Sequence, residues 1–232
     1  MKNYVYIISA LIMLATNSVN ARELDISITN LTQGIYFTPL LAATHDSDTH
    51  LFQPGTMASA NLQAMAEGGD ISGLISDLAV VNANVSENPA AGLLAPGSTA
   101  MTIINSGAGN SYFSLVAMLL PTNDGFVGID ALSLPNIPGT YTYYLNAYDA
   151  GTEANDEIIN GAGTPGSAGI PADPGGNNGT SATGVTSEEG NSMVHTHRGN
   201  LGDTDVTGGI SDLDSRIHRW LNPVAQLVIT IK

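Results

Sequence analysis

Short stretches of alternating or continuous apolar residues recur along the chain, separated by Gly, Pro, Asn and Asp. Alternation with a period of two is typical of strands that bury one face, and an unbroken apolar run is typical of a strand buried on both faces. The pattern predicts seven or eight strands, a number typical of β-sandwiches. The strands that we can place lie at 24–28, 35–41, 78–81, 101–103, 112–120, 141–147 and 227–231.

Two stretches differ from this strand pattern. Residues 58–67 are rich in helix formers and are followed by two glycines, which predicts a short helix, with a further helical turn as an option at 71–78. Residues 160–191 consist mostly of small and polar residues, which predicts a long mobile surface loop and not a second domain. The expected fold class is therefore all-β, an antiparallel β-sandwich of seven to eight strands with one or two short helices and a long Gly/Pro-rich loop.

The beginning of the chain has the order of a secretory signal peptide. One cation, Lys2, precedes an apolar run from Tyr4 to Ala15 that is too short to span a bilayer, and small residues follow up to Ala21. We expect a signal peptide at 1–21 and a single domain at 22–232, since about 200–250 residues are common for one all-β domain. The protein is then secreted or periplasmic, with no transmembrane segment.

The chain is acidic and contains no cysteine. Its formal net charge is −15, and removal of Lys2 with the signal peptide makes it −16. Such a surface repels nucleic acid and anionic lipid and favours divalent cations and cationic partners. Acidity with few lysines also suits a salty habitat, and the two interpretations are compatible. Without disulfides, an exported chain has to depend on a packed core, with a bound metal as a further option.

Three acidic residues form the candidate metal site. Asp149-Ala150-Gly151-Thr152-Glu153 has two acids four positions apart around a glycine, and Asp124 follows the apolar run 112–120. Calcium takes about six to eight oxygen ligands from carboxylates, carbonyls and waters. The spacing alone is compatible with a Ca²⁺ site at Asp124, Asp149 and Glu153 and with solvated acidic loops. Asp130 is a further candidate for a water-mediated contact.

The histidines offer a different metal chemistry. His195 and His197 lie on one face of an extended segment and could bind zinc or copper with a third ligand such as His218. The other interpretation is that both are polar surface residues or hydrogen-bond partners. His45-Asp46 is interpreted as a structural turn that bonds to the backbone.

Enzymatic motifs are missing from the sequence. It has no Gly-x-Ser-x-Gly elbow, no glycine loop for phosphate followed by Lys, no zinc-protease helix motif and no cysteine nucleophile. A glycosidase with two carboxylates stays an alternative, although one Trp and four Phe offer few aromatic surfaces for a sugar.

Several segments resemble the spondin N-terminal domain, a module of extracellular matrix proteins of the F-spondin and mindin group and of secreted bacterial proteins. The most specific is Asp149-Ala-Gly-Thr-Glu153, and residues 124–134 add to it. Residues 37–46 and 220–225 are similar to the bacterial branch.

The resemblance implies an antiparallel β-sandwich with Ca²⁺ bound by three acids, which correspond to Asp124, Asp149 and Glu153. The third acid is usually aspartate in animal members, and Gly125 stands where tryptophan is common. These departures, and the missing animal cysteines, bear on animal-type partner binding more than on the fold.

The expected function is that of a secreted, non-enzymatic, calcium-binding module for adhesion or recognition at a cell surface, with an extracellular protein or glycan as partner. Two alternatives stay open at this point. One is a metal- or carboxylate-dependent hydrolase that uses the same loops, and the other is a structural envelope protein with an incidental metal ion.

Overall fold

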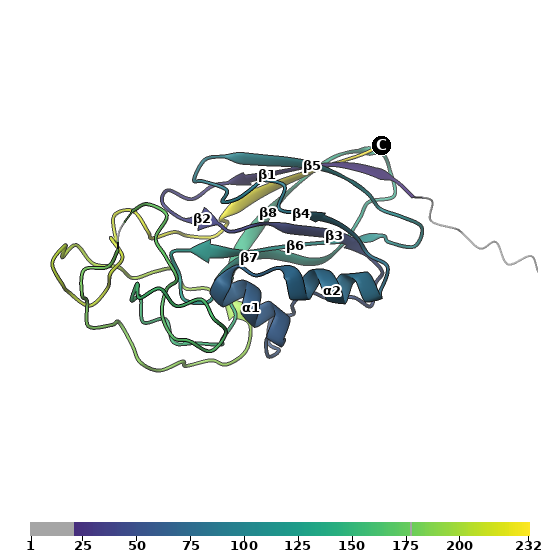
Figure 1. Cartoon of the computed structure of the whole chain (residues 1–232). Helices are drawn as coiled ribbons and strands as arrows, with labels where there is room; N and C mark the ends of the chain where they lie inside the picture. Colours follow the sequence, from purple (N-terminus) through teal and green to yellow (C-terminus); the bar gives the residue numbers. More distant parts are fainter. Residues whose placement is uncertain (1–20, 177) are drawn as a thin grey trace, which may run out of the picture.

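The structure is a computed structural model that describes residues 21–176 and 178–232 (Figure 1). The predicted signal peptide lies outside the described residues, apart from Ala21. The elements, in chain order, are β1 (Glu23–Asn30), β2 (Tyr36–Phe37), β3 (Leu41–His45), α1 (Ala60–Gly68), α2 (Ser72–Val80), β4 (Asn84–Glu87), β5 (Thr99–Asn105), β6 (Tyr112–Leu120), β7 (Gly125–Ser133), β8 (Gly139–Asp149), β9 (His195–Thr196) and β10 (Ala225–Ile231).

The strands form one 10-stranded antiparallel sheet that nearly closes on itself. Eight strands follow the order β4-β3-β6-β7-β8-β10-β1-β5, and the two-residue strands β2 and β9 pair with β6 and β8. The hydroxyls of Ser86 on β4 and Thr102 on β5 hydrogen-bond at 2.7 Å, so the two ends of the sheet meet. The predicted antiparallel all-β fold is confirmed.

Period-two alternation creates the main core. Leu24, Ile26 and Ile28 of β1 are buried, and so are Leu227 and Ile229 of β10, while the residues between them are partly exposed. Full burial of one such side chain is worth about 1.5–3 kcal/mol, so this paired face is a large part of the stability.

Both helices cover one face of the sheet, beside β3 and β6 (Figure 1). The hydroxyl of Ser59 accepts a hydrogen bond from Leu62 N at the start of α1, and Gly69 ends the helix with φ 72°. Leu62 and Met65 pack in a second core with the outer face of β6. This coverage explains why β6 is apolar without alternation, as the sequence predicted for a strand buried on both faces.

Three sequence-based predictions differ from the structure. The predicted strand at 78–81 is wrong, because Leu74 and Leu78 face the second core one helical turn apart in α2. The predicted strand 35–41 is divided into β2 and β3 around Pro39. Strand β7 was not expected, since Gly128 breaks its pattern. A Cβ there would lie 2.7 Å from the Phe52 ring, so the glycine permits close packing.

The chain between β8 and β10 gathers at one end of the sheet, coloured green to yellow in Figure 1. Buried carboxylates organise it in place of regular secondary structure. Glu157 accepts hydrogen bonds from Leu201 N, Gly202 N and the Ser211 hydroxyl at 2.6–2.8 Å. The mobility of residues 160–191 stays a prediction. Among the described residues, no helix is long and apolar enough to cross a membrane.

Candidate functional site

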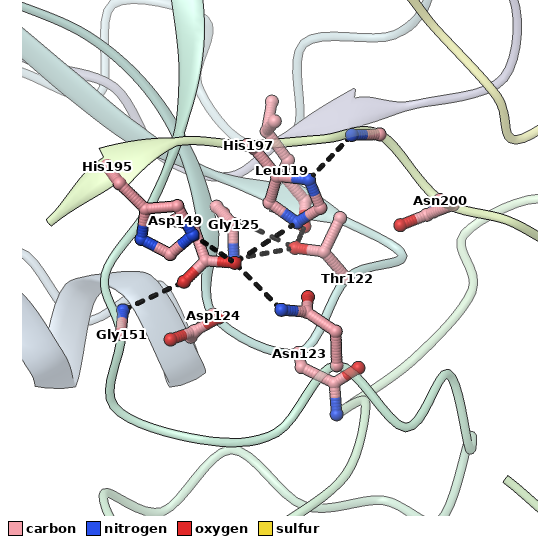
Figure 2. Close-up of polar contacts among 12 residues, drawn as sticks. Leu119, Thr122, Asn123, Asp124, Gly125, Asp149, Gly151, His195, His197 and Asn200 are labelled. Carbon is pink, nitrogen blue, oxygen red and sulfur yellow. Dashed lines mark hydrogen bonds and ion pairs between the residues drawn. The ribbon is translucent and has the colours of Figure 1, made fainter. Parts of the chain in front are cut away.

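Two neighbouring turns carry the three predicted acids. Asp124 lies in the turn between β6 and β7, and Asp149 is the last residue of β8. Gly125 pairs with Asp149 across the two strands, and Ala150 N donates to the Asp124 carbonyl at 3.2 Å. The register of the sheet therefore holds Asp124 beside Asp149, as Figure 2 shows.

A left-handed glycine shapes the second turn. Gly151 has φ 68°, and a Cβ on it would lie 2.6 Å from the Asn191 carbonyl oxygen. Its N–H donates to Asp149 Oδ1 at 2.8 Å (Figure 2). The glycine thus lets the chain reverse tightly and directs Thr152 and Glu153 towards Asp124.

The Asp124 carboxylate is fully buried, and only one of its two oxygens accepts hydrogen bonds. Its Oδ2 accepts hydrogen bonds from Thr152 N at 2.8 Å, the Thr152 hydroxyl at 3.1 Å and Glu153 N at 3.3 Å. Its Oδ1 is buried and has no hydrogen-bond partner among the described residues. Burial, together with the nearby charge of Asp149, raises the pKa of Asp124 to about 7.

Only one of the two carboxylate oxygens of Glu153 is hydrogen-bonded, as in Asp124. Its Oε2 accepts a hydrogen bond from Gly169 N at 2.8 Å, whereas its Oε1 is buried with no hydrogen-bond partner in the described part of the chain. Burial is the main cause that raises the pKa of Glu153 to about 8, and the charges of Asp124 and Glu67 add to it. Asp124 and Glu153 thus each have one unpartnered oxygen, and no lysine or arginine of the described residues hydrogen-bonds to either carboxylate.

Asp149 is surrounded by donors and histidines. Its Oδ2 accepts from Asn155 Nδ2 at 2.7 Å, and the Nε2 atoms of His195 and His197 each lie 3.9 Å from this oxygen (Figure 2). The histidines reach it because β9 pairs His195 with Asp149. Asp149 therefore has an acidic side, towards Asp124, and an imidazole side.

His197 is a buried, neutral imidazole that accepts a hydrogen bond at Nδ1. Burial lowers its pKa to about 4, and its Nδ1 accepts from Gly199 N at 2.9 Å. The proton of the neutral ring therefore sits on Nε2, which faces Asp149 and has no hydrogen-bond partner within residues 21–176 and 178–232. The 3.9 Å contact is consequently not an ion pair, and Nε2 of His197 has no lone pair for a metal.

Other candidates from the sequence lie elsewhere. Asp130 accepts from Leu51 N at 2.6 Å and contacts His50 Nδ1 at 2.5 Å, so the prediction that it supports the metal site is wrong. His218 faces Asp173 at 3.6 Å and is not the third ligand to the histidine pair. The structural turn at His45 is confirmed, because its Nδ1 contacts the Asp46 carbonyl at 2.8 Å.

Sequence reasoning missed the amides of the site. Asn155 positions Asp149, and Asn123 connects the first turn to the following segment through Glu157 N and Asp156. In the sequence, the only sign of their role was their position, because Asn123 precedes Asp124 and Asn155 follows Glu153 by two residues. Within residues 21–176 and 178–232, no three acidic or histidine side chains converge into a complete metal site.

Comparison with known protein families identifies the family of this chain. The Spondin_N family model matches residues 29–158, more than half of the 232-residue chain, and the matched range contains all three acids. The match stops before β9 and β10, although β10 pairs with both β1 and β8. No curated protein matches the chain. The chain belongs to the Spondin_N family.

Proposed function

We propose that this protein is a secreted, non-enzymatic module that binds calcium and acts in adhesion or in recognition at an extracellular surface. The observation that carries the proposal is the pair of buried, unpartnered oxygens, Asp124 Oδ1 and Glu153 Oε1. A buried carboxylate oxygen without a donor is costly, and a bound cation removes that cost.

The donor set fits a hard cation. Asp124, Asp149 and Glu153 supply oxygen atoms only, which is the preference of Ca²⁺, and nearby carbonyls and water can add to the coordination. When bound, the ion supplies positive charge that neutralises the carboxylates. The residues themselves do the rest. Thr152 N donates to Asp124 Oδ2 and Gly169 N donates to Glu153 Oε2, which leaves Asp124 Oδ1 and Glu153 Oε1 for the ion.

Binding also requires a small movement. The three carboxylates do not form a complete site in the present arrangement, so the unpartnered oxygens have to turn towards a shared point. Glu153, one methylene longer than aspartate, has the reach for this turn. We expect the ion to draw the turn after β8 against the turn after β6.

Burial favours a structural ion over a catalytic one. Asp124, Asp149 and Glu153 expose 0%, 1% and 8% of their surface, whereas a catalytic metal keeps an open position for substrate or water. Spondin_N domains are also typically non-enzymatic and extracellular in type. The hydrolase alternative therefore has less support than a calcium-stabilised recognition module.

Thermal unfolding tests the calcium site. Calcium at a hundredfold excess over its Kd should stabilise the wild-type protein by about 2.7 kcal/mol, which raises the Tm by roughly 5–10 °C for a domain of this size. Asp124→Asn keeps the shape of the side chain but removes its charge, so calcium should no longer raise the Tm. The exposed acid Asp48 provides a matched control, and Asp48→Asn should respond as the wild type does.

The only tryptophan gives an independent signal. The Trp220 ring lies 5.0 Å from the His197 ring, and His197 faces Asp149. Calcium should therefore change the Trp220 emission in wild type and in Asp48→Asn, but not in Asp124→Asn. If neither the Tm nor the emission of the wild type responds to calcium, the calcium site does not exist.

The recognition role needs a separate assay. Beads coated with the protein can be tested on matrix proteins and on a glycan array, in calcium and in chelator. Attachment that requires calcium and is lost in Asp149→Asn supports the module proposed here. Calcium binding without attachment to any of these surfaces would leave a structural envelope protein as the better description.

A further inference from the structure

His195 is held in the state that metal-binding histidines adopt. Its Nδ1 lies 2.8 Å from the Met193 carbonyl oxygen, which can only accept a hydrogen bond, so Nδ1 carries the proton. In the neutral ring, Nε2 then has a free lone pair. Metal-binding histidines almost always donate their other ring N–H in this way, often to a backbone carbonyl.

The lone pair of His195 faces a second electron-pair donor. Nε2 lies 3.9 Å from Asp149 Oδ2, with no hydrogen atom between them in the neutral ring, and Figure 2 shows the two groups side by side. A positive charge between the two atoms makes this approach favourable, and either a proton on Nε2 or a metal ion supplies it. The His195 side chain is 33% exposed, so an ion can reach it from solvent.

A small cavity lies on this side of Asp149. It has a volume of about 200 Å³, and its lining includes Asp149, His195, Glu188 and Glu189. Glu189 is held in place by Asn191 N, which donates to its Oε1 at 2.7 Å. A nitrogen ligand, a carboxylate and two further acids from a loop thus border one solvent-connected space.

We propose that this cavity binds a divalent transition-metal ion of the zinc class through His195 Nε2 and Asp149 Oδ2. Glu188 and Glu189 do not converge on these two atoms in the present arrangement, so one of their carboxylates has to move towards the ion, and water completes the coordination. Imidazole nitrogen favours zinc and copper over calcium, which prefers oxygen. The nitrogen site therefore differs in chemistry from the calcium site on the other side of Asp149, and it does not depend on that proposal.

His197 has a different role from its neighbour. Its Nε2 carries the proton and lies 3.9 Å from the same Asp149 oxygen, so it has no lone pair with which to bind the ion. The zinc-binding pair suggested by the sequence is thus reduced to one histidine.

Arg198 also lines the cavity, and its positive charge opposes a cation there. Arg198→Gln should consequently tighten zinc binding.

Zinc titration of the metal-free mature chain tests the proposal, with zinc alone as the probe and calorimetry as the readout. Loss of residues that merely support a ligand costs about 10–100-fold in metal affinity, so His195→Gln should weaken zinc binding at least tenfold. His50→Gln is the matched control, because His50 is also an exposed histidine beside an aspartate, Asp130. It should bind zinc as the wild type does.

The calcium variants separate the two sites. Asp124→Asn should bind zinc normally even where it no longer responds to calcium, and His195→Gln should keep the calcium response. Zinc-edge X-ray absorption of the wild-type protein gives a second readout that needs no variant, and it should show nitrogen in the first coordination shell. Unchanged zinc affinity in His195→Gln, no zinc uptake by the wild type at micromolar concentration, or an all-oxygen shell would each overturn the proposal.

Discussion

Calcium affinity should fall roughly several hundredfold between pH 8 and pH 6, because metal ligands must be deprotonated before they bind. The pKa of Asp124 is raised to about 7 and that of Glu153 to about 8, mainly by burial. At pH 8 one of these groups is largely ionised and the other half ionised, whereas at pH 6 both are mostly protonated. Isothermal titration with calcium at several pH values measures the change.

The same shifts fix the pH dependence of stability without calcium. The folded pKa of each acid lies above its unfolded value near 4, so the folded state binds more protons between about pH 4 and pH 8. Stability that depends on these protons is present at low pH and is lost as the pH rises through the folded pKa values. The free energy of unfolding of the metal-free protein should therefore decrease across this range.

Calcium should largely remove that decrease, since it stabilises the ionised carboxylates. Binding near pH 7 should also release protons, which titrations in buffers of different ionisation enthalpy detect. Asp124→Asn should release fewer protons, and the exposed-acid variant Asp48→Asn should match the wild type. A calcium affinity that is the same at pH 6 and pH 8 would mean that Asp124 and Glu153 do not bind the ion.

The acidic turn could be predicted because the residues that determine its conformation lie next to one another in the chain. Asp149, Gly151 and Glu153 are close in sequence, and the glycine that permits the left-handed turn is visible between the two acids. Asp124 could be added because it follows the long apolar run of β6. In both places the residues that determine the geometry are neighbours along the chain.

The histidine side of the site depends on a distant pairing. β9 is two residues long, and it joins β8 about 46 positions after Asp149, with a Gly- and Pro-rich stretch between them. A two-residue strand leaves no hydrophobic period in the sequence. The pattern could show that His195 and His197 share a face, but not that this face meets Asp149.

Strand and helix assignments failed where tertiary packing decided the outcome. The apolar residues at 78–81 suit either a strand or the end of a helix, and contact of Leu74 and Leu78 with the second core selects the helix. Gly128 weakens the strand pattern of β7, yet the Phe52 ring needs the space that a side chain would fill. Periodicity alone gives no sign of such a partner.

Glu157→Ala should be the most destabilising single change at the loop end of the molecule, by about 3 kcal/mol or more. Glu157 is 1% exposed, and its carboxylate accepts hydrogen bonds from Leu201 N, Gly202 N and the Ser211 hydroxyl. Each buried donor left without a partner costs about 1–3 kcal/mol. For a domain of this size the Tm should fall by roughly 6–12 °C, which calorimetry measures directly.

The backbone of Glu157 adds to this expectation. Its φ is 59°, a left-handed conformation that is unfavourable for a residue with a side chain, so the hydrogen bonds of the carboxylate have to hold it. Glu157 N also donates to Asn123 Oδ1 at 3.1 Å, directly beside Asp124. Loss of the carboxylate should therefore loosen the first turn of the proposed calcium site as well, and calcium should bind more weakly to Glu157→Ala.

Glu188→Ala is the matched control, because it removes one negative charge from an exposed position of the same segment. In metal-free buffer its Tm should stay close to the wild-type value. Hydrogen exchange adds the spatial readout: amides of residues 200–212 should lose protection in Glu157→Ala, while those of β1 and β10 keep theirs. Equal Tm values for the two variants would show that the buried carboxylate does not hold the segment between β8 and β10, and that this segment is organised by its turns alone.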